Sequence, residues 1–213
     1  MFGPWLSVTL PISVTVLLAF GANLGDRGET IIEAQRELAI IPGVTHLRAS
    51  SLRESIALTP SGPDPDAPRY LNGVALADTT LTPHELLDVL QRLEARHGRV
   101  RDARWGDRTL DIDIITYGGK LIADDRLTVP HPRAHERDFV LAPWLELDPH
   151  AVLIGHGRVA ELLTRIGDTT SSTGQSRPAV DHAEAIGIRT HVFEEGYFRP
   201  HWVTLEREGV NGH

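Results

Sequence analysis

Two aspartates, Asp111 and Asp113, stand one residue apart in a run rich in β-branched residues. Side chains of a strand alternate between its two faces, so both carboxylates should share one face while Ile112 and Ile114 enter the core. Like charges held that close destabilise each other unless a cation lies between them. Because Mg²⁺ prefers oxygen ligands and usually takes one or two protein carboxylates, the pair predicts a magnesium site. The alternative for an isolated Asp-x-Asp is an exposed strand with solvated charges.

Arginines are dense immediately before the acid pair, at Arg99, Arg101, Arg104 and Arg108. A guanidinium group matches phosphate oxygens through two parallel hydrogen bonds. Acids that bind a cation, next to arginines that bind phosphates, indicate a site for a phosphorylated ligand. The density of arginines also makes the solvated-strand alternative less attractive.

The acid pair needs a sheet around it, and the chain offers strand, helix, strand, strand, helix and strand in that order. Asp26 with Glu29, and Thr82 with Glu85, have the spacing of capping boxes that begin helices. We predict strands over 14–20, 44–57, 70–77 and 109–117, helices over 26–40 and 82–97, a polar loop over 59–68, an extended segment at 127–131 and a partly helical one at 136–147. This succession favours an α+β fold, a ferredoxin-like split β-α-β sheet with helices on one face, over a doubly wound α/β fold.

Composition divides the chain into three parts. We expect an N-terminal arm over residues 1–13, a folded domain over 14–166, and a linker with a C-terminal extension over 167–213, where Ser, Thr and Asp replace apolar residues. The apolar stretch 5–20 is too short and too interrupted to span a bilayer, and no Lys or Arg precedes it as in a signal peptide. We therefore expect no membrane partner. A homodimer formed through the extensions is left as an open alternative.

Bulk charge and cysteine content exclude several classes of function. The 213 residues carry a formal net charge of −8, which argues against sequence-independent nucleic-acid binding because that needs a basic surface. The absence of cysteine rules out a disulfide framework, a thiolate zinc site and a cysteine nucleophile. It also fits a reducing, cytoplasmic location.

Four sequence blocks, in the same order, resemble the 6-hydroxymethyl-7,8-dihydropterin pyrophosphokinase family over roughly residues 14–165. The blocks are Phe20-Gly-Ala-Asn-Leu-Gly-Asp26, Tyr70-Leu-Asn72, Arg104-Trp-Gly-Asp-Arg-Thr-Leu-Asp-Ile-Asp113, and Leu127-Thr-Val-Pro-His-Pro-Arg133 continuing to Arg137-Asp-Phe139. The resemblance implies a ferredoxin-like fold and transfer of pyrophosphate from ATP to a dihydropterin alcohol in folate biosynthesis. It also implies release of AMP and the use of two Mg²⁺ ions.

The resemblance assigns Asp111 and Asp113 to both metal ions, which would bridge the phosphates. It assigns nucleotide contacts to Gln91, Glu94, Arg101, Arg126, His131 and Arg137, and catalytic roles to Arg99, Arg108 and Asp113. From periodicity alone, Gln91 and Glu94 would be solvated residues of a helix face. For each arginine taken singly, a surface salt bridge is the simpler interpretation. For His131, a histidine packed in a loop is as good an interpretation as a ligand. No histidine or lysine stands out as a general base, which leaves Asp113 or a metal-bound water.

A pterin is flat, with polar edges and aromatic faces, so its pocket should combine ring stacking with amide hydrogen bonds. The residues that match the family's pterin contacts are Ser55, Tyr70, Asn72, Trp105 and Phe139. Core packing is the simpler role for Tyr70 and Phe139. Trp105 differs from them because it lies in an Arg/Gly loop and follows no apolar periodicity.

The chain departs from the family pattern at a few positions. Ala22 stands where the first block usually has serine, and Arg53-Glu-Ser-Ile-Ala57 stands where the family usually has Tyr-Glu-Thr-x-Pro. Asp107 replaces a frequent proline before Arg108. The first two departures concern the pterin contacts near Ser55, and the third adds an acid beside the site and should loosen the turn. All three leave the metal and phosphate residues unchanged.

Two other functions are compatible with parts of this pattern. Another Mg²⁺-dependent nucleotidyltransferase would also use an Asp-x-Asp pair, but such enzymes usually carry a Gly-Ser pair on a helix shortly before the acids, and residues 98–110 have none. A ferredoxin-like RNA-binding module would stack bases on an aromatic and basic strand. The strand here carries two acids, which would repel a phosphate backbone.

Overall fold

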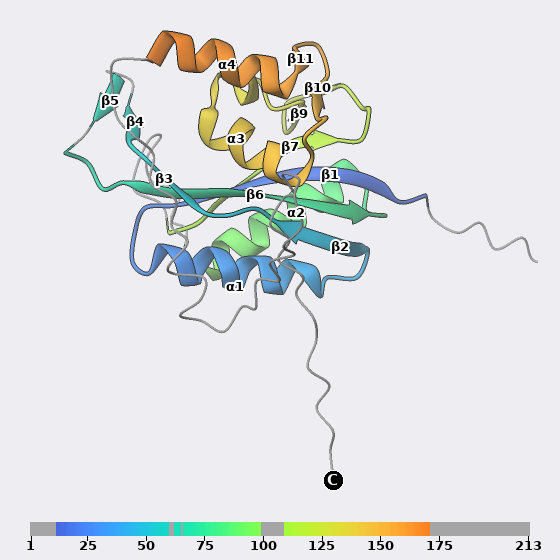
Figure 1. The fold of residues 1–213 in the computed structure, drawn as a ribbon. Helices are drawn as coiled ribbons and strands as arrows, with labels where there is room; N and C mark the ends of the chain where they lie inside the picture. Colours follow the sequence, from blue (N-terminus) through green and yellow to red (C-terminus); the bar gives the residue numbers. More distant parts are fainter. Residues whose placement is uncertain (1–11, 60–61, 65, 99–108, 171–213) are drawn as a thin grey trace, which may run out of the picture.

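The computed structural model describes residues 12–59, 62–64, 66–98 and 109–170 (Figure 1). Its centre is a five-stranded sheet in the order β2-β6-β1-β7, with β3 also paired to β6, and every pairing is antiparallel. The strands are β1 (Val14–Ala22), β2 (Val44–Ala49), β3 (Arg53–Ser55), β6 (Tyr70–Thr79) and β7 (Asp111–Tyr117). This order, with helices after β1 and β6, is the ferredoxin-like split β-α-β arrangement predicted from the sequence.

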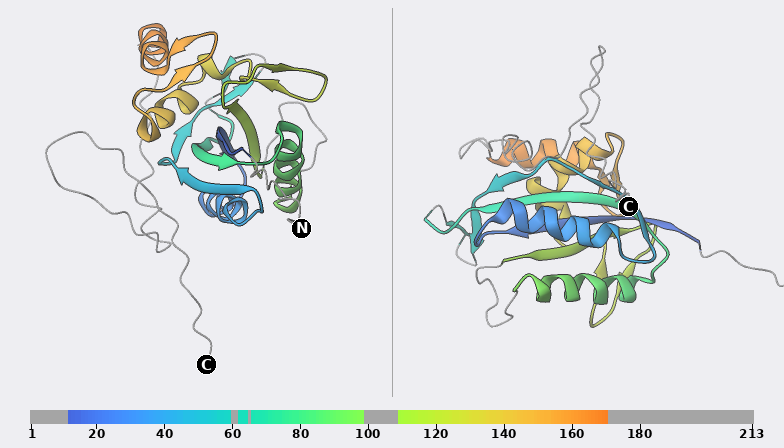
Figure 2. Two further views of the ribbon diagram at one scale, coloured as in Figure 1. Left: turned by 90° about the vertical axis from the view of Figure 1, so that its right-hand side faces the viewer. Right: turned by 90° about the horizontal axis from the view of Figure 1, so that it is seen from below.

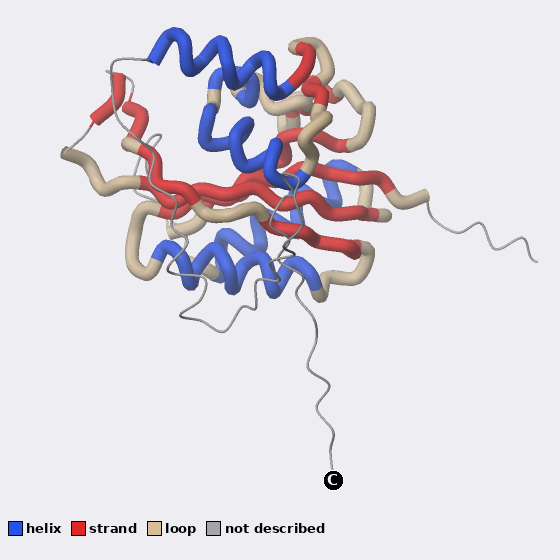
Figure 3. The backbone as a smooth tube through the Cα atoms, in the orientation of Figure 1, coloured by secondary structure: helices blue, strands red, loops and turns tan. Residues whose placement is uncertain are grey.

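Helices cover both faces of this sheet, whereas the sequence analysis expected them on one face. One face carries α1 (Arg27–Ala39) and α2 (Pro83–Arg96), and the other carries α3 (Asp138–Leu147) and α4 (Val159–Thr170) (Figures 1 and 2). The sheet therefore forms the middle layer of three, which the tube drawing in Figure 3 shows as strands between two layers of helix. We refer to the two sides as the α1/α2 face and the α3 face.

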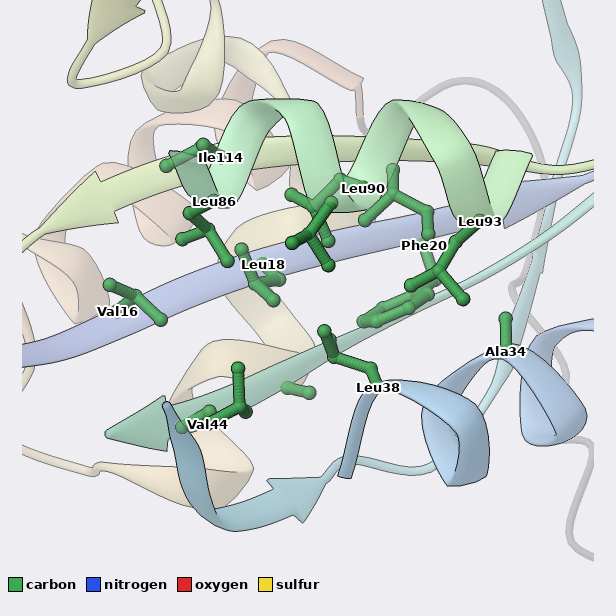
Figure 4. Packing of buried hydrophobic residues seen from close by; sticks show 14 of the residues in the cluster. Val16, Leu18, Phe20, Ala34, Leu38, Val44, Leu86, Leu90, Leu93 and Ile114 are labelled. Carbon is green, nitrogen blue, oxygen red and sulfur yellow. The ribbon is translucent and has the colours of Figure 1, made fainter. Parts of the chain in front are cut away.

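The α1/α2 face holds the larger apolar core. Alternation along β1 sends Val16, Leu18 and Phe20 to this side. Leu90 and Leu93 of α2 meet them there (Figure 4). The sequence of α2 favours this helix because Thr82 and Glu85 form a complete capping box, with Pro83 in the first turn.

The α3 face holds a second core at only one end of the sheet. Leu17, Val74 and Ile115 contribute from the strands, and Leu141 and Trp144 from α3. Burying apolar area on this side fixes α3 over β6. The other end of the same face carries polar side chains and is described below.

The strand predicted over residues 44–57 is broken into three pieces, and this prediction was wrong. The β2 ladder ends because the Ser50 side chain, rather than a backbone group, accepts the hydrogen bond of Val74 N–H, at 2.9 Å. Leu52 then crosses Gly73 so closely that a Cβ there would lie 2.7 Å from its Cδ2 atom. Pairing with β6 resumes at β3, and β4 (Ala57–Thr59) pairs away from the main sheet with β5 (Gly62–Asp64), which lies inside the loop predicted over 59–68.

The remaining elements are short, apart from one helix that was not predicted. Two small hairpins pair β8 (Ile122–Ala123) with β9 (Thr128–Val129) and β10 (Val152–Leu153) with β11 (Gly157–Arg158), and a 3₁₀ turn, η1 (Ala134–Glu136), precedes α3. Helix α4 was not predicted, and it continues to Thr170, beyond the expected start of the linker at residue 167. Among the described residues, no helix is both long enough and apolar enough to cross a membrane.

Candidate active site

The acid pair lies on the α3 face, as strand alternation predicts. Asp111 and Asp113 are half-buried, whereas Ile112 and Ile114 are only 5% and 4% exposed in the core of the opposite face. A register shift at the next residue then places Ile115 in the second core. The two carboxylates therefore sit just where the apolar cover of the α3 face ends.

A row of residues at one register connects the acid pair to the opposite side of the sheet. Asp111 pairs with Gly21 of β1, Gly21 pairs with Asn72 of β6, and Asn72 pairs with Arg53 of β3. A Cβ at Gly21 would lie 3.0 Å from the Asn72 Oδ1 atom. Because Gly21 has no side chain, the Asn72 amide can lie close to the backbone of β1 at this register.

Asp113 lies beside an arginine and a histidine. Its Oδ2 atom lies 3.2 Å from Arg137 Nη1 and 3.7 Å from His131 Nε2. Two hydrogen bonds hold His131 in place. Its backbone N–H donates to Ile115 O, and its ring Nδ1 accepts from the backbone N–H of Arg133. Since Nδ1 accepts, the neutral ring carries its proton on Nε2, which faces Asp113.

Several opposing effects act on the pKa of His131. Burial, which disfavours the imidazolium, lowers it most, and Arg137 and Arg133 also lower it, while the nearby Asp113 and Asp111 raise it. The net result is a pKa below the ordinary value for histidine. At neutral pH the site therefore contains a neutral imidazole beside the Asp113–Arg137 ion pair.

Glu94 is buried, and the interpretation of it as a solvated helix-face residue was wrong. Its side chain on α2 is 2% exposed, and its Oε1 accepts a hydrogen bond of 2.8 Å from Ile112 N–H. Because β7 is the last strand of the sheet, that backbone group has no neighbouring strand to bond with. Glu94 thus fixes the backbone between Asp111 and Asp113, and sequence spacing gave no signal for this contact.

Two of the residues matched to the pterin, Ser55 and Tyr70, lie close to Asn72. The Asn72 Nδ2 group donates to Ser55 Oγ at 2.8 Å, and Tyr70 pairs with Ser55 in the strand ladder. Phe139 lies half-buried in the first turn of α3. The Arg137 guanidinium lies 5.6 Å from the Phe139 ring centroid, so the same arginine contacts both the acid pair and the aromatic residue.

Two of the residues matched to the nucleotide, Arg126 and Gln91, are not among the described partners of Asp113 or Asn72. Arg126, near the β8–β9 hairpin, is paired with Asp88 of α2, and Gln91 is half-buried on α2. The matched residues of the arginine-rich loop, namely Arg99, Arg101, Trp105 and Arg108, lie outside the described residues.

The donor set at the acid pair suits Mg²⁺. Two carboxylates on one face, partly open to solvent, are the oxygen ligands that this ion takes alongside water and phosphate. No group of three or more His, Cys, Asp or Glu side chains arranged to hold a metal ion occurs within the part of the chain that the structure describes. A cation here would consequently depend on the substrate phosphates for part of its coordination.

One charged residue near the site was missed in the sequence analysis. Glu146 of α3 is bonded to Ser51 and Arg53, beside the row of residues that crosses the sheet. A lone carboxylate in the apolar run from Phe139 to Leu147 was the available signal.

Comparisons with known proteins agree with this geometry. The family model described as 7,8-dihydro-6-hydroxymethylpterin-pyrophosphokinase matches residues 17–149. The chain is 39% identical over 155 residues to the Haemophilus influenzae 2-amino-4-hydroxy-6-hydroxymethyldihydropteridine pyrophosphokinase, covering 73% of this chain and 94% of that protein. It is 43% identical over 148 residues to the protein of the same name from Pseudomonas aeruginosa, covering 70% and 89%.

Solved structures support the fold, and a second family model matches the end of the chain. A crystal structure of Plasmodium falciparum HPPK-DHPS, wild type with pteroate, superposes with a TM-score of 0.58 at 13% identity, covering 76% of this chain and 44% of that one. This chain thus spans less than half of that protein. A model described as capsule polysaccharide biosynthesis protein matches residues 165–213, which are mostly outside the described residues and too few to assign a family. The first model covers more than half of the chain, and the chain therefore belongs to the 7,8-dihydro-6-hydroxymethylpterin-pyrophosphokinase family.

Proposed function

We propose that the polar end of the α3 face binds both substrates of a pyrophosphokinase reaction. As a member of its family, the chain transfers pyrophosphate from ATP to 6-hydroxymethyl-7,8-dihydropterin, releasing AMP, in folate biosynthesis. The observation that carries the site assignment is the shared face of Asp111, Asp113 and Asn72, with Gly21 between them. In this arrangement the carboxylate pair can bind the cations that accompany the phosphates of ATP, and the neighbouring Asn72 amide can bind the pterin ring.

Asp111 and Asp113 are the residues that would hold Mg²⁺, and we propose two ions. When bound, the ions neutralise charge on the phosphates of ATP. Arg137 keeps a positive charge 3.2 Å from Asp113, where it can also meet a phosphate oxygen. His131 borders the same carboxylate. We assign further phosphate contacts to Arg99, Arg101, Arg108 and Arg126, and a nucleotide contact to Gln91. To Glu94, which is buried and bonded to the Ile112 N–H, we assign the anchoring of β7 in place of the nucleotide contact that the resemblance implies.

The dihydropterin lies against the sheet on the other side of Gly21. The Asn72 amide offers donor and acceptor atoms to the polar edge of the ring, and Ser55, bonded to that amide, orients it. Tyr70 and Phe139 provide apolar contact, and Trp105 is assigned a stacking role.

The reaction is a displacement at phosphorus. The hydroxymethyl oxygen attacks the β-phosphorus of ATP, a new oxygen–phosphorus bond forms, and the bond from the β-phosphorus to the bridging oxygen of the α-phosphate breaks, so AMP leaves. The hydroxyl proton passes to the Asp113 carboxylate. The protein contributes chiefly position and charge, since Asn72 and Asp111 hold the two substrates at one register of the sheet.

Location and assembly are additional proposals. The absence of cysteine suits a cytoplasmic location. A homodimer through residues 1–13 and 167–213 stays a prediction, because nearly all of these residues lie outside the described part of the chain.

The products distinguish this function from its rivals. Incubation with ATP, Mg²⁺ and the dihydropterin alcohol should form free AMP and a pyrophosphorylated pterin in equal amounts, separated by chromatography. A nucleotidyltransferase would leave AMP attached to the acceptor and release pyrophosphate. ADP as the product, or no consumption of the pterin alcohol, would contradict the proposal.

A further inference from the structure

Glu146 joins helix α3 to the short strand β3 through a group of polar contacts. Its Oε1 lies 2.5 Å from Arg53 Nη2 and 3.1 Å from Arg53 Nε. Its Oε2 accepts the backbone N–H of Ser51 at 3.0 Å and the Ser51 hydroxyl at 2.8 Å. The Glu146 and Arg53 side chains are 23% and 34% exposed, so the ion pair is only partly shielded from solvent.

These contacts occur at the break in the β2–β6 ladder. Ser51 lies in the break between β2 and β3, and Glu146 accepts its N–H in place of a neighbouring strand. Two residues later, Arg53 resumes pairing opposite Asn72. Because β3 has only three residues, few backbone hydrogen bonds hold it. The carboxylate of Glu146 links it to α3, and the Arg27–Glu54 ion pair links it to α1 on the opposite face.

Glu146 also shares a helix face with a candidate pterin residue. Phe139 and Glu146 are seven positions apart, which places them on the same side of α3, about 10 Å apart along its axis. Phe139 lies near Arg137 at the N-terminal end of α3, and Glu146 binds β3 at the C-terminal end. Ser55 of β3 bonds the Asn72 amide. Glu146 thus joins α3 to β3, the strand whose Arg53 pairs with Asn72 and whose Ser55 accepts the Asn72 amide hydrogen bond.

We propose that Glu146 is a positioning residue for the dihydropterin. It holds β3 against α3, so that Ser55 and Asn72 keep the ring aligned with Phe139, while the acid pair on β7 is held independently by Glu94. This inference rests on the proposed function, because it assigns the pterin to the Asn72 side of the sheet. It requires that loss of Glu146 affect the pterin much more than ATP.

Substrate affinities of variants test this selectivity. The variant Glu146→Ala should weaken dihydropterin binding about tenfold, measured by fluorescence of the pterin in the presence of a non-reactive ATP analogue, and should change the affinity for the analogue less than about twofold. Glu146→Gln keeps an acceptor for Ser51 but loses the charge facing Arg53, so about a threefold effect is expected. The control is Glu161→Gln, which removes an exposed carboxylate of α4 and should have no effect.

Hydrogen exchange supplies a second readout that is independent of turnover. In Glu146→Ala, the amides of Ser51 to Ser55 should exchange faster, whereas those of Asp111 to Tyr117 should keep their wild-type rates. Equal weakening of pterin and ATP analogue, unchanged pterin affinity, or uniform acceleration of exchange would overturn the positioning role. A wild-type chain that binds pterin but forms no AMP would instead contradict the proposed function, and one that binds no pterin would overturn both.

Discussion

The two faces of the sheet differ in what their side chains do, although the same strands build both. The α1/α2 face carries the larger apolar core, in which Glu94 is a buried charged residue, whereas the α3 face is apolar only where α3 and α4 cover it and polar beyond that. Strand β7 shows this division within four residues, because Ile112 and Ile114 enter one core while Asp111 and Asp113 lie on the other face, in the candidate site. Stability and chemistry are thus assigned to opposite sides of one strand, and a one-residue slip would exchange them.

Removing an acid should show the strongest separation between the faces. In Asp111→Ala we expect AMP formation to fall by at least about a hundredfold, because the charge that gathers the cation is lost. The midpoint of urea unfolding should stay close to wild type. Glu33→Ala, which removes an exposed carboxylate of α1, should leave both quantities unchanged. Near-normal turnover in the Asp111 variant would contradict the metal assignment.

A core substitution on the α1/α2 face should have the opposite effect. Leu90 is fully buried, so Leu90→Ala should lower the free energy of unfolding by about 2–5 kcal/mol. The fraction that remains folded should keep its turnover, measured per folded molecule below the melting temperature. Leu121, which is 72% exposed, gives the matched control, since Leu121→Ala should cost less than about 0.5 kcal/mol. If Leu90→Ala lost turnover but kept its stability, the α1/α2 face would not have the purely stabilising role that distinguishes it from the α3 face.

Glu94 links the two faces, and its removal should affect both. Glu94→Ala leaves the Ile112 N–H buried without an acceptor, so we expect a loss of about 1–3 kcal/mol of stability together with reduced turnover. Glu94→Gln retains an acceptor oxygen and should preserve more of both properties. Urea unfolding and AMP assays measure the two effects. If Glu94→Ala weakened ATP binding alone, with wild-type stability, a direct nucleotide contact would replace the anchoring role.

The smallest expected effect concerns a histidine pair on the covered part of the α3 face. His135 and His156 stack with ring centroids 3.9 Å apart, and burial together with the neighbouring His135 lowers the pKa of His156. Because the unfolded chain then binds a proton more readily, stability should be intact above pH 6.5 and should decline as the pH falls below it. His156→Gln should show a weaker decline in urea unfolding between pH 7 and 5. An identical pH dependence in both proteins would exclude a contribution from this pair, and turnover should not change.

Local patterns in the sequence were enough to predict the features that depend on few neighbours. Alternation placed Asp111 and Asp113 on one face, and the spacing of Thr82 and Glu85 located the start of α2. Apolar residue type is less informative at a helix end, because Ile40 is 79% exposed where α1 stops.

Features that depend on distant segments were not accessible in this way. The break after β2 arises because Ser50 bonds to Val74 across the sheet, and nothing near Ser50 in the sequence indicates it. The contacts of Glu94 and Glu146 likewise depend on strands β7 and β3, which are distant from them in the sequence. Arg126 was matched to ATP by resemblance, but the structure pairs it with Asp88, and this partner lies 38 positions away in the chain.

Counting divalent cations tests the central claim most directly. Mn²⁺ can replace Mg²⁺ and is detectable by electron paramagnetic resonance, so it can be titrated into the chain with a non-reactive ATP analogue. The wild type should bind two ions per chain, and Asp111→Ala and Asp113→Ala should each lose at least one, with the fold intact by circular dichroism. Full cation binding in both variants would show that the acid pair on β7 does not hold the metal.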